Sequence, residues 1–212
     1  MIKGVAFDLD GTLIDSVGIY SSSLSEVLNS MGMRATTEQI MPYIGLPLEE
    51  MLRMMFMITD KAEISEIRAK RDAIIARNIR NIHIFPESMP TLHSLRSEGM
   101  RLAIVTSSSS KFVSLIDSEF GIASMVDAVV TRDNVARMKP NPDPYIKAFG
   151  ELSVQAEEGM VVGDSELADI APGKAIGAKT VLVARGGKPK SAADFVVGGV
   201  DRIIEIIKDG PK

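Results

Sequence analysis

Residues 2–12 read IKGVAFDLDGT, and this stretch decides which fold the sequence predicts. The apolar run before Asp8 is typical of a buried central strand. Asp8 and Asp10 follow two positions apart, so in an extended chain their side chains would share one face. Gly11 then allows a sharp turn of the backbone. Because an unpaired carboxylate at the end of a buried strand is costly, we expect a cation there, most simply a hard divalent metal.

The composition is that of a globular protein. The chain has 212 residues, 45% of them hydrophobic and 25% charged, which is enough for one core and a small second domain. The net charge of −4 argues against a nucleic-acid partner, and the lack of cysteine fits a reducing compartment. No signal peptide and no run of about 20 apolar residues is found. We therefore expect a cytoplasmic monomer or homodimer with no membrane partner.

After the acidic turn the sequence changes to helical periodicity, with almost no strand signal as far as Arg80. Thr36 with Gln39 is a possible capping box, and Pro47 before two glutamates is a good helix start. These features predict an inserted domain of four helices over residues 16–82. Its methionine-rich helix is expected to turn Met51, Met54, Met55 and Ile58 to one side.

From Phe85 onward, helix and strand signals alternate. Short apolar runs predict strands at residues 101–105, 126–130, 160–162, 180–183 and 195–197. This alternation predicts an α/β fold with a doubly wound, mostly parallel, Rossmann-like sheet and right-handed crossovers. The sheet domain would comprise residues 1–15 and 83–212.

Polar clusters follow several of the predicted strands. The carboxyl ends of parallel strands meet at one edge of such a sheet, where ligands bind. Sequence-distant polar groups should therefore converge there. The predicted cluster comprises Asp8, Asp10, Thr106, Ser107, Lys139, Asp164 and Asp169.

In order along the chain, these segments resemble the four signatures of the haloacid dehalogenase superfamily of phosphotransferases. Residues 8–12 (DLDGT) match the first signature, and Thr106 after a strand matches the second. Residues 139–140 (KP) match the third, and residues 163–169 (GDSELAD) match the fourth. The helical insert is similar to the cap of the branch that contains phosphoglycolate phosphatase and β-phosphoglucomutase.

The resemblance implies a Mg²⁺-dependent phosphatase for a small phosphorylated metabolite, a phosphomonoester similar to phosphoglycolate. Asp8 would attack phosphorus and form an aspartyl-phosphate. Asp10 would protonate the leaving oxygen and later deprotonate the attacking water. Mg²⁺ would be held by the Asp8 carboxylate, the Asp10 main-chain carbonyl and Asp164.

The resemblance also implies roles around these three aspartates. Lys139 would supply a fixed positive charge beside Asp8, and Thr106 would hold phosphoryl oxygens. Asp169 would order a metal-bound water or simply bond the backbone. The remaining residues assigned to substrate binding are Leu9, Gly11, Ser107 and Gly45.

Several alternatives remain open. Gly45 lies in a segment similar to the specificity loop of this branch, but it is as readily a helix-ending glycine. The same site would serve a phosphosugar mutase or a pyrophosphatase. A dehalogenase is disfavoured because that chemistry does not use Asp10, and a non-enzymatic scaffold is disfavoured because the reactive groups are intact. Glu87 and residues 171–173 depart from the pattern of the branch.

Overall fold

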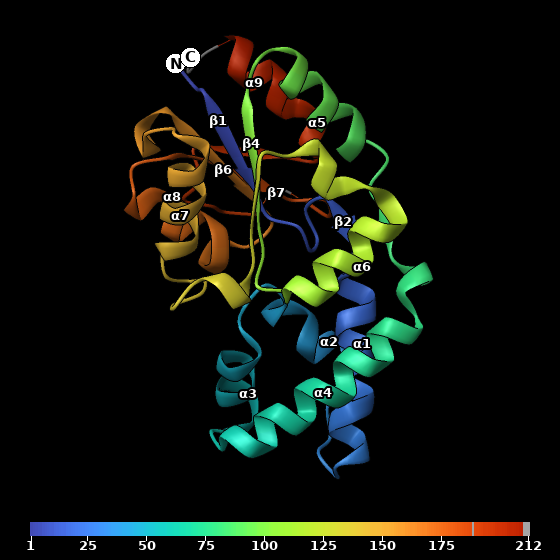
Figure 1. The fold of residues 1–212 in the computed structure, drawn as a ribbon. Coiled ribbons are helices and arrows are strands. Elements are labelled where there is room, and N and C mark those ends of the chain that lie inside the picture. The colour runs from blue at the N-terminus through green and yellow to red at the C-terminus, as the bar shows by residue number, and fades with distance from the viewer. Residues whose placement is uncertain (188, 210–212) are drawn as a thin grey trace.

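The structure, a computed structural model, describes residues 1–187 and 189–209. Its centre is a six-stranded sheet in the order β5-β4-β1-β6-β7-β8, in which every neighbouring pair is parallel. The strands are β1 (Gly4–Phe7), β4 (Arg101–Val105), β5 (Ala128–Val130), β6 (Gly159–Gly163), β7 (Lys179–Val183) and β8 (Phe195–Val197). Because the chain winds outward from β1 in both directions (Figure 1), the prediction of a doubly wound α/β sheet is confirmed.

Helices cover both faces of the sheet because successive side chains of each strand point to opposite faces. Val5 and Phe7 of β1 belong to one core cluster, and Ala6 between them belongs to the other. The first cluster involves α5 (Ser88–Ser97), α6 (Ser110–Phe120) and α9 (Ile203–Asp209), whereas α7 (Asp143–Leu152) and α8 (Ala171–Ala175) lie on the other face. Among the residues described, each helix is too short or too polar to cross a lipid bilayer.

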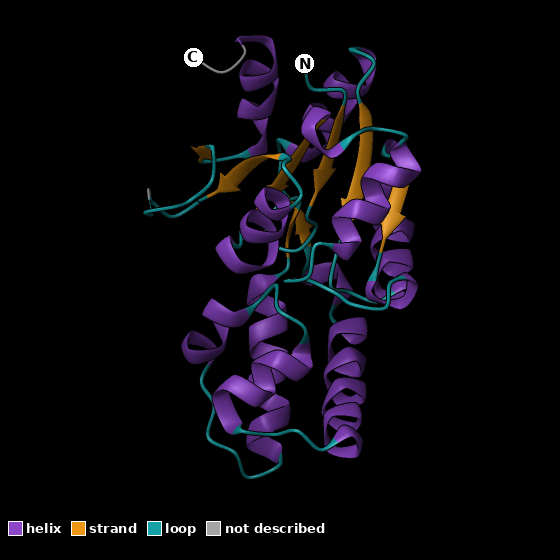
Figure 2. Ribbon diagram, turned by 90° about the vertical axis from the view of Figure 1, so that its left-hand side faces the viewer, coloured by secondary structure: helices purple, strands orange, loops and turns teal. Residues whose placement is uncertain are grey.

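A separate group of helices lies beyond the carboxyl ends of the central strands (Figure 2). It contains α1 (Val17–Ser30), α2 (Thr37–Ile40), α3 (Leu48–Phe56) and α4 (Lys61–Arg77). These helices share their own core, in which Leu28, Ile40, Leu52 and Ile67 are fully buried. The exact division of the chain at residues 16 and 82 stays a prediction.

The structure confirms the predicted helix starts of this insert but only part of its predicted buried methionine face. The capping box of Thr36 and Gln39 forms at the start of α2, and Pro47 is the N-cap of α3. Met51 is buried, as expected. Met54 is 46% exposed, so the expectation that it faces the same side is wrong. The core of the insert is small, and Met51 shares it mainly with leucine and isoleucine side chains from several helices.

The two connections between the sheet and the helical insert lie side by side. The strand β2 (Ile14–Asp15) precedes α1, and β3 (His83–Ile84) follows α4. They pair as a short antiparallel ladder. The return chain is also tied to the acidic turn, because the Phe85 main-chain N–H donates a hydrogen bond to the Leu13 carbonyl at 3.1 Å.

Glu87, which departs from the pattern of the branch, has a partner of its own. It forms an ion pair with Arg185, whose Nη2 donates a hydrogen bond to the Thr12 carbonyl at 2.8 Å. The Arg185 guanidinium carbon lies 3.3 Å from the centre of the Phe85 ring. Glu87 thus helps to hold the turn that follows the acidic residues.

Candidate active site

The turn after β1 is tied to neighbouring segments on both sides. The main-chain N–H of Asp8 donates to the Val162 carbonyl, and that of Gly11 donates to the Ile14 carbonyl, each at 2.8 Å. Gly11 has a φ of +87°, a conformation that favours glycine. A Cβ atom at this position would also overlap the Asp164 carboxylate. Glycine therefore lets the turn form and lets Asp164 approach it.

Lys139 joins two of the aspartates. Its Nζ donates hydrogen bonds to Asp8 Oδ1 and to Asp169 Oδ1, both at 2.7 Å, and its side chain is 1% exposed. Burial by itself would lower the pKa of Lys139, but the two carboxylates raise that pKa well above its usual range. The ammonium group is therefore charged and fixed beside Asp8.

Asp169 is held on both of its oxygens. Oδ1 also accepts a hydrogen bond from the Tyr145 hydroxyl at 2.6 Å, and Oδ2 accepts one from the Ser165 main-chain N–H at 3.0 Å. A Cβ atom on Gly163 would overlap the Asp169 carboxyl group, so this glycine permits the close approach. Sequence reasoning missed Tyr145, because a tyrosine at the start of a helix carries no signal of such a contact.

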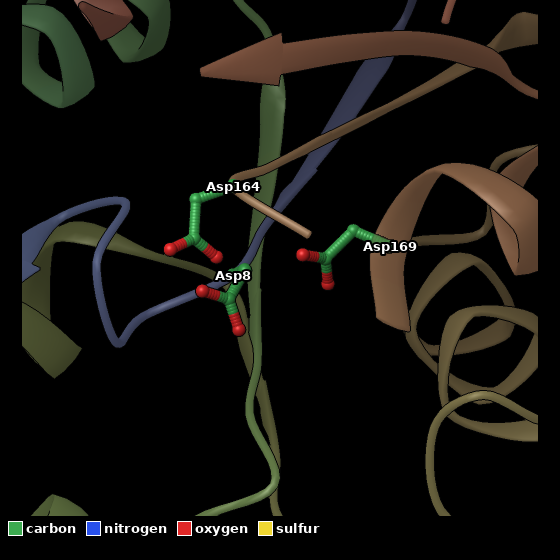
Figure 3. A group of neighbouring side chains, drawn as sticks. All are labelled: Asp8, Asp164 and Asp169. Carbon is green, nitrogen blue, oxygen red and sulfur yellow. The ribbon is translucent and has the colours of Figure 1, made fainter. Parts of the chain in front are cut away.

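The carboxylates of Asp8, Asp164 and Asp169 face a common space (Figure 3). One oxygen of each lies within 4.8 Å of the others. Burial raises the pKa of Asp8 to about 7 despite the opposing effect of Lys139, and burial together with the Asp8 charge raises the pKa of Asp164 well above its usual range. So concentrated an acidic group is costly unless a cation or protons neutralise it.

One atom of this group marks where a cation fits. Asp8 Oδ2 is buried and has no hydrogen-bond partner among the described residues, whereas Asp8 Oδ1 is occupied by Lys139. Hard divalent cations prefer such carboxylate oxygens. Since both oxygens of Asp169 already accept hydrogen bonds, Asp8 and Asp164 are the better placed ligands of the three.

Asp10 faces a different set of partners. Its Oδ1 accepts a hydrogen bond from Ser16 Oγ at 2.7 Å, and its Oδ2 accepts from Thr106 Oγ1 at 3.0 Å and Ser108 Oγ at 2.8 Å. Burial raises the pKa of Asp10, and the three hydroxyl donors partly offset this effect. The side chain is not part of the acidic group of Asp8, Asp164 and Asp169.

The other predicted residues surround these carboxylates, with some unexpected contacts. The Thr106 hydroxyl is engaged by Asp10 and by the Ser108 main-chain N–H at 3.0 Å. Ser107 Oγ donates to the Gly45 carbonyl at 3.1 Å, which joins the helical insert to the sheet edge. Leu9 is fully buried within the turn. Sequence reasoning did not assign Ser16 or Ser108, although both follow a predicted signature closely.

A chamber lies between the sheet edge and the helical insert. Its floor contains Asp8 and Asp10, which the chain turns toward it from the end of β1. The insert contributes Gly45 and apolar side chains to the walls. The full lining is Asp8, Asp10, Tyr20, Leu24, Ile44, Gly45, Leu46, Leu48, Met51, Arg68, Arg71, Ser107, Ser108 and Arg132.

Comparisons with known proteins agree with this arrangement. The chain matches the family model of haloacid dehalogenase-like hydrolases over residues 5–183. It is 32% identical to the phosphoglycolate phosphatase of Vibrio parahaemolyticus, with 97% of this chain and 96% of that protein covered. It is 27% identical to the pyrophosphatase PpaX of Oceanobacillus iheyensis, with 98% of each chain covered.

A solved structure supports the fold independently. The crystal structure of a hydrolase from Pseudomonas syringae superposes with a TM-score of 0.89 at 22% identity, covering 99% of this chain and 100% of that one. The family model covers most of the chain, including the strands that carry the acidic residues. The chain therefore belongs to the haloacid dehalogenase-like hydrolases and is a phosphatase of that family.

Proposed function

We propose that this phosphatase is Mg²⁺-dependent and hydrolyses a small phosphomonoester similar to phosphoglycolate through an aspartyl-phosphate on Asp8. The observation that carries the proposal is Asp8 Oδ2 at the end of β1, which has no hydrogen-bond partner in the described part of the chain and lies beside Asp164 and a charged Lys139. The similarity to a phosphoglycolate phosphatase along nearly the whole chain supports the substrate class.

The reaction would take place in two displacements. In the first, a carboxylate oxygen of Asp8 bonds to phosphorus, and the bond from phosphorus to the leaving oxygen breaks. Asp10, whose pKa is raised by burial, gives its proton to that oxygen. In the second, Asp10 takes a proton from a water molecule as the water attacks phosphorus, and phosphate leaves Asp8.

The remaining groups would neutralise charge. Asp8, Asp164 and the Asp10 carbonyl would hold Mg²⁺, which when bound supplies positive charge against the phosphoryl oxygens. Lys139 keeps a second positive charge beside Asp8, and Asp169 with Tyr145 fixes its position. Ser16, Thr106 and Ser108 hold the Asp10 carboxyl group for proton transfer.

Pyrophosphate hydrolysis is a second candidate. It is supported by the similarity to the pyrophosphatase PpaX over 98% of the chain. The same nucleophile and acid would act, with phosphate rather than an alcohol as the leaving group. A panel of phosphoglycolate, pyrophosphate, hexose phosphates and nucleoside monophosphates, assayed for released phosphate, would separate these candidates.

The decisive test concerns the nucleophile. Purified protein is mixed with Mg²⁺ and a phosphomonoester that carries labelled phosphate, and the reaction is quenched with acid. We expect label on the wild-type protein, none on Asp8→Asn, and no turnover with a chelator. Asp201→Asn, at an exposed position outside the acidic group and the chamber lining, serves as the matched control. Turnover retained by Asp8→Asn, or label on another residue, would contradict the proposal.

A further inference from the structure

The walls of the chamber carry positive charge that the proposed reaction does not use. Arg68 and Arg71 enter the lining from α4, and Arg132 enters it from the segment after β5. The proposal above already assigns Lys139 and the metal to the phosphoryl group. These guanidinium groups therefore lie where the remainder of a substrate would be.

Arg71 is the most deeply placed of the three. The residue is 8% exposed, and its guanidinium carbon lies 5.4 Å from the centre of the Tyr20 ring. Its hydrogen bonds to the described residues come from Nε and Nη2, which both donate to Asp72 Oδ1 at 3.0 and 2.6 Å. Nη1 donates to no other described residue, and the Arg71 side chain belongs to the lining of the chamber.

A chain of contacts fixes Arg71 relative to the reacting groups. The Tyr20 hydroxyl lies 2.8 Å from Ser108 Oγ, and Ser108 Oγ donates to Asp10 Oδ2 at 2.8 Å. Because the Ser108 hydroxyl donates its hydrogen to Asp10, the Tyr20 hydroxyl is the donor in the hydrogen bond between Tyr20 and Ser108. The arginine is thus held at a set position from the acid that serves the leaving oxygen.

Arg132 approaches from the sheet domain and has weaker partners. Its nearest carboxylate oxygens, on Asp72 and Asp133, lie 3.6 Å from its nitrogens, which is beyond a good hydrogen bond. Arg68 pairs with Glu49 through Nη2, and Arg71 pairs with Asp72 through Nε and Nη2, so each keeps a nitrogen without a partner among the described residues. A small oxyanion in the chamber would therefore meet donors from both parts of the protein, Arg71 from the helical insert and Arg132 from the sheet domain.

We propose that Arg71 and Arg132, with Arg68 at the rim, bind a second oxyanion of the substrate. The preferred substrates are then small phosphate compounds whose leaving group carries a carboxylate or a phosphate. This inference rests on the proposed phosphatase function and specifies its substrate class. Guanidinium groups suit the site because they form paired, charge-assisted hydrogen bonds with both kinds of oxyanion.

The test compares matched ligands with and without the second charge. For turnover, phosphoglycolate and pyrophosphate are each compared with ethyl phosphate as a ratio of kcat/KM. For binding, phosphonopropionate is compared with propylphosphonate by calorimetry, which needs no turnover. We expect the compound with the second oxyanion to be favoured about tenfold or more in each pair, which is the size of one charge-assisted hydrogen bond.

Substitutions assign the preference to residues. Arg71→Met and Arg132→Met should each reduce the ratio about tenfold, and Arg71→Lys should retain more of it than Arg71→Met. Arg77→Met is the matched control, because Arg77 lies on the same helix but its Nε donates to the Ala73 carbonyl outside the chamber. A general loss of folding would lower kcat/KM or the bound fraction for both compounds of a pair and would leave their ratio unchanged.

The outcomes separate the two proposals. A ratio near one in the wild type, or a ratio that neither Arg71→Met nor Arg132→Met changes, would overturn the second-oxyanion site. Preference for pyrophosphate over phosphoglycolate would identify the oxyanion as phosphate, and the reverse would identify it as carboxylate. If none of the three phosphate compounds is hydrolysed, the proposed phosphatase reaction is contradicted. The ratio of the affinities for phosphonopropionate and propylphosphonate would still decide whether the arginine site exists.

Discussion

Asp8 and Asp10 are two residues apart and yet have opposite surroundings. Asp8 lies among charges, with Lys139 on one oxygen and the other left without a hydrogen bond from the described residues. Asp10 is held by three neutral hydroxyl groups. Two carboxylates in such different environments suit the two tasks proposed above, a nucleophile that a bound cation would keep ionised and an acid that carries a proton.

Asp10→Asn tests this division of roles. We expect the metal affinity to be retained and kcat for ethyl phosphate to fall about 10²–10⁴-fold, the usual contribution of general acid–base catalysis. Formation of the aspartyl-phosphate from para-nitrophenyl phosphate should fall far less, because its leaving group needs no proton. Rapid-quench kinetics with both esters measures the difference. An equal loss of this first step for both would assign Asp10 another role.

Gly11→Ala tests the turn. The methyl group would overlap the Asp164 carboxylate and force a strained φ, so Mg²⁺ affinity should fall by about tenfold or more, as when the supports of other metal sites are altered. Calorimetric titration with Mg²⁺ provides the measurement. Gly18→Ala is the control, since a Cβ there would lie more than 4 Å from every other atom considered in the described part of the chain. Equal affinity in both variants would show that the turn does not limit metal binding.

At the scale of elements, one glycine controls how closely α8 approaches the sheet. A Cβ on Gly173 would lie 2.9 Å from Thr180 Cγ2 and 3.0 Å from Val161 Cβ, both on the strands beneath. The helix would have to move outward to accept a larger residue. Because α8 directly continues the π-helical segment Glu166–Ile170 that carries Asp169, this packing helps to place the acidic group.

We therefore expect Gly173→Ala to lower the free energy of unfolding by about 1–3 kcal/mol, the usual cost of overpacking. Gly150→Ala, in α7 with no neighbour within 4 Å of the added carbon, should be neutral or slightly stabilising. Urea denaturation of the two variants measures both values. A stable Gly173→Ala protein would mean that α8 can shift without strain.

The elements also show what the sequence can and cannot predict. The run at residues 101–105 was expected as a strand and forms β4 with the same bounds, because a short apolar segment between turn signals has few other solutions. The hydrogen bond from Ser108 to Asp10 joins residues 98 positions apart. Such contacts between hydroxyl and carboxylate groups leave no periodic pattern, so the supports of Asp10 emerged only from the folded chain.

Family resemblance and local physics predicted different parts of the site. The four signatures indicated which segments would meet, and the parallel sheet explains why they do. The resemblance did not indicate that Tyr145 would hold Asp169 or that Arg71 would lie on Tyr20. Those contacts depend on where a helix axis lies after packing, which a one-dimensional pattern does not specify.

At the scale of the whole molecule, the acidic group links stability to pH. The pKa of Asp8 is raised to about 7 by burial in the folded state. The unfolded chain has an ordinary aspartate pKa of about 4. The raised pKa of Asp8 therefore contributes folding stability that is present at low pH and is lost as the pH rises through about 7. A metal ion at the proposed site would compete with protons for the same oxygens, so metal binding should strengthen as the protons leave.

Thermal denaturation with and without Mg²⁺ tests this linkage. The rise in Tm caused by Mg²⁺ should be larger at pH 8 than at pH 6, and Asp8→Asn should remove most of the difference between the two pH values. Asp201→Asn should behave like the wild type. A rise in Tm that is the same at both pH values would show that the ion binds elsewhere.

The short ladder of β2 and β3 has a consequence for how such a protein can change. It pairs Asp15 with His83, so the inserted helical segment between these residues begins and ends at neighbouring positions. An inserted segment of another length could replace this one without altering the order of the central strands. Under the proposed function, the part that meets the leaving group and the part that carries the nucleophile could therefore diversify at separate rates.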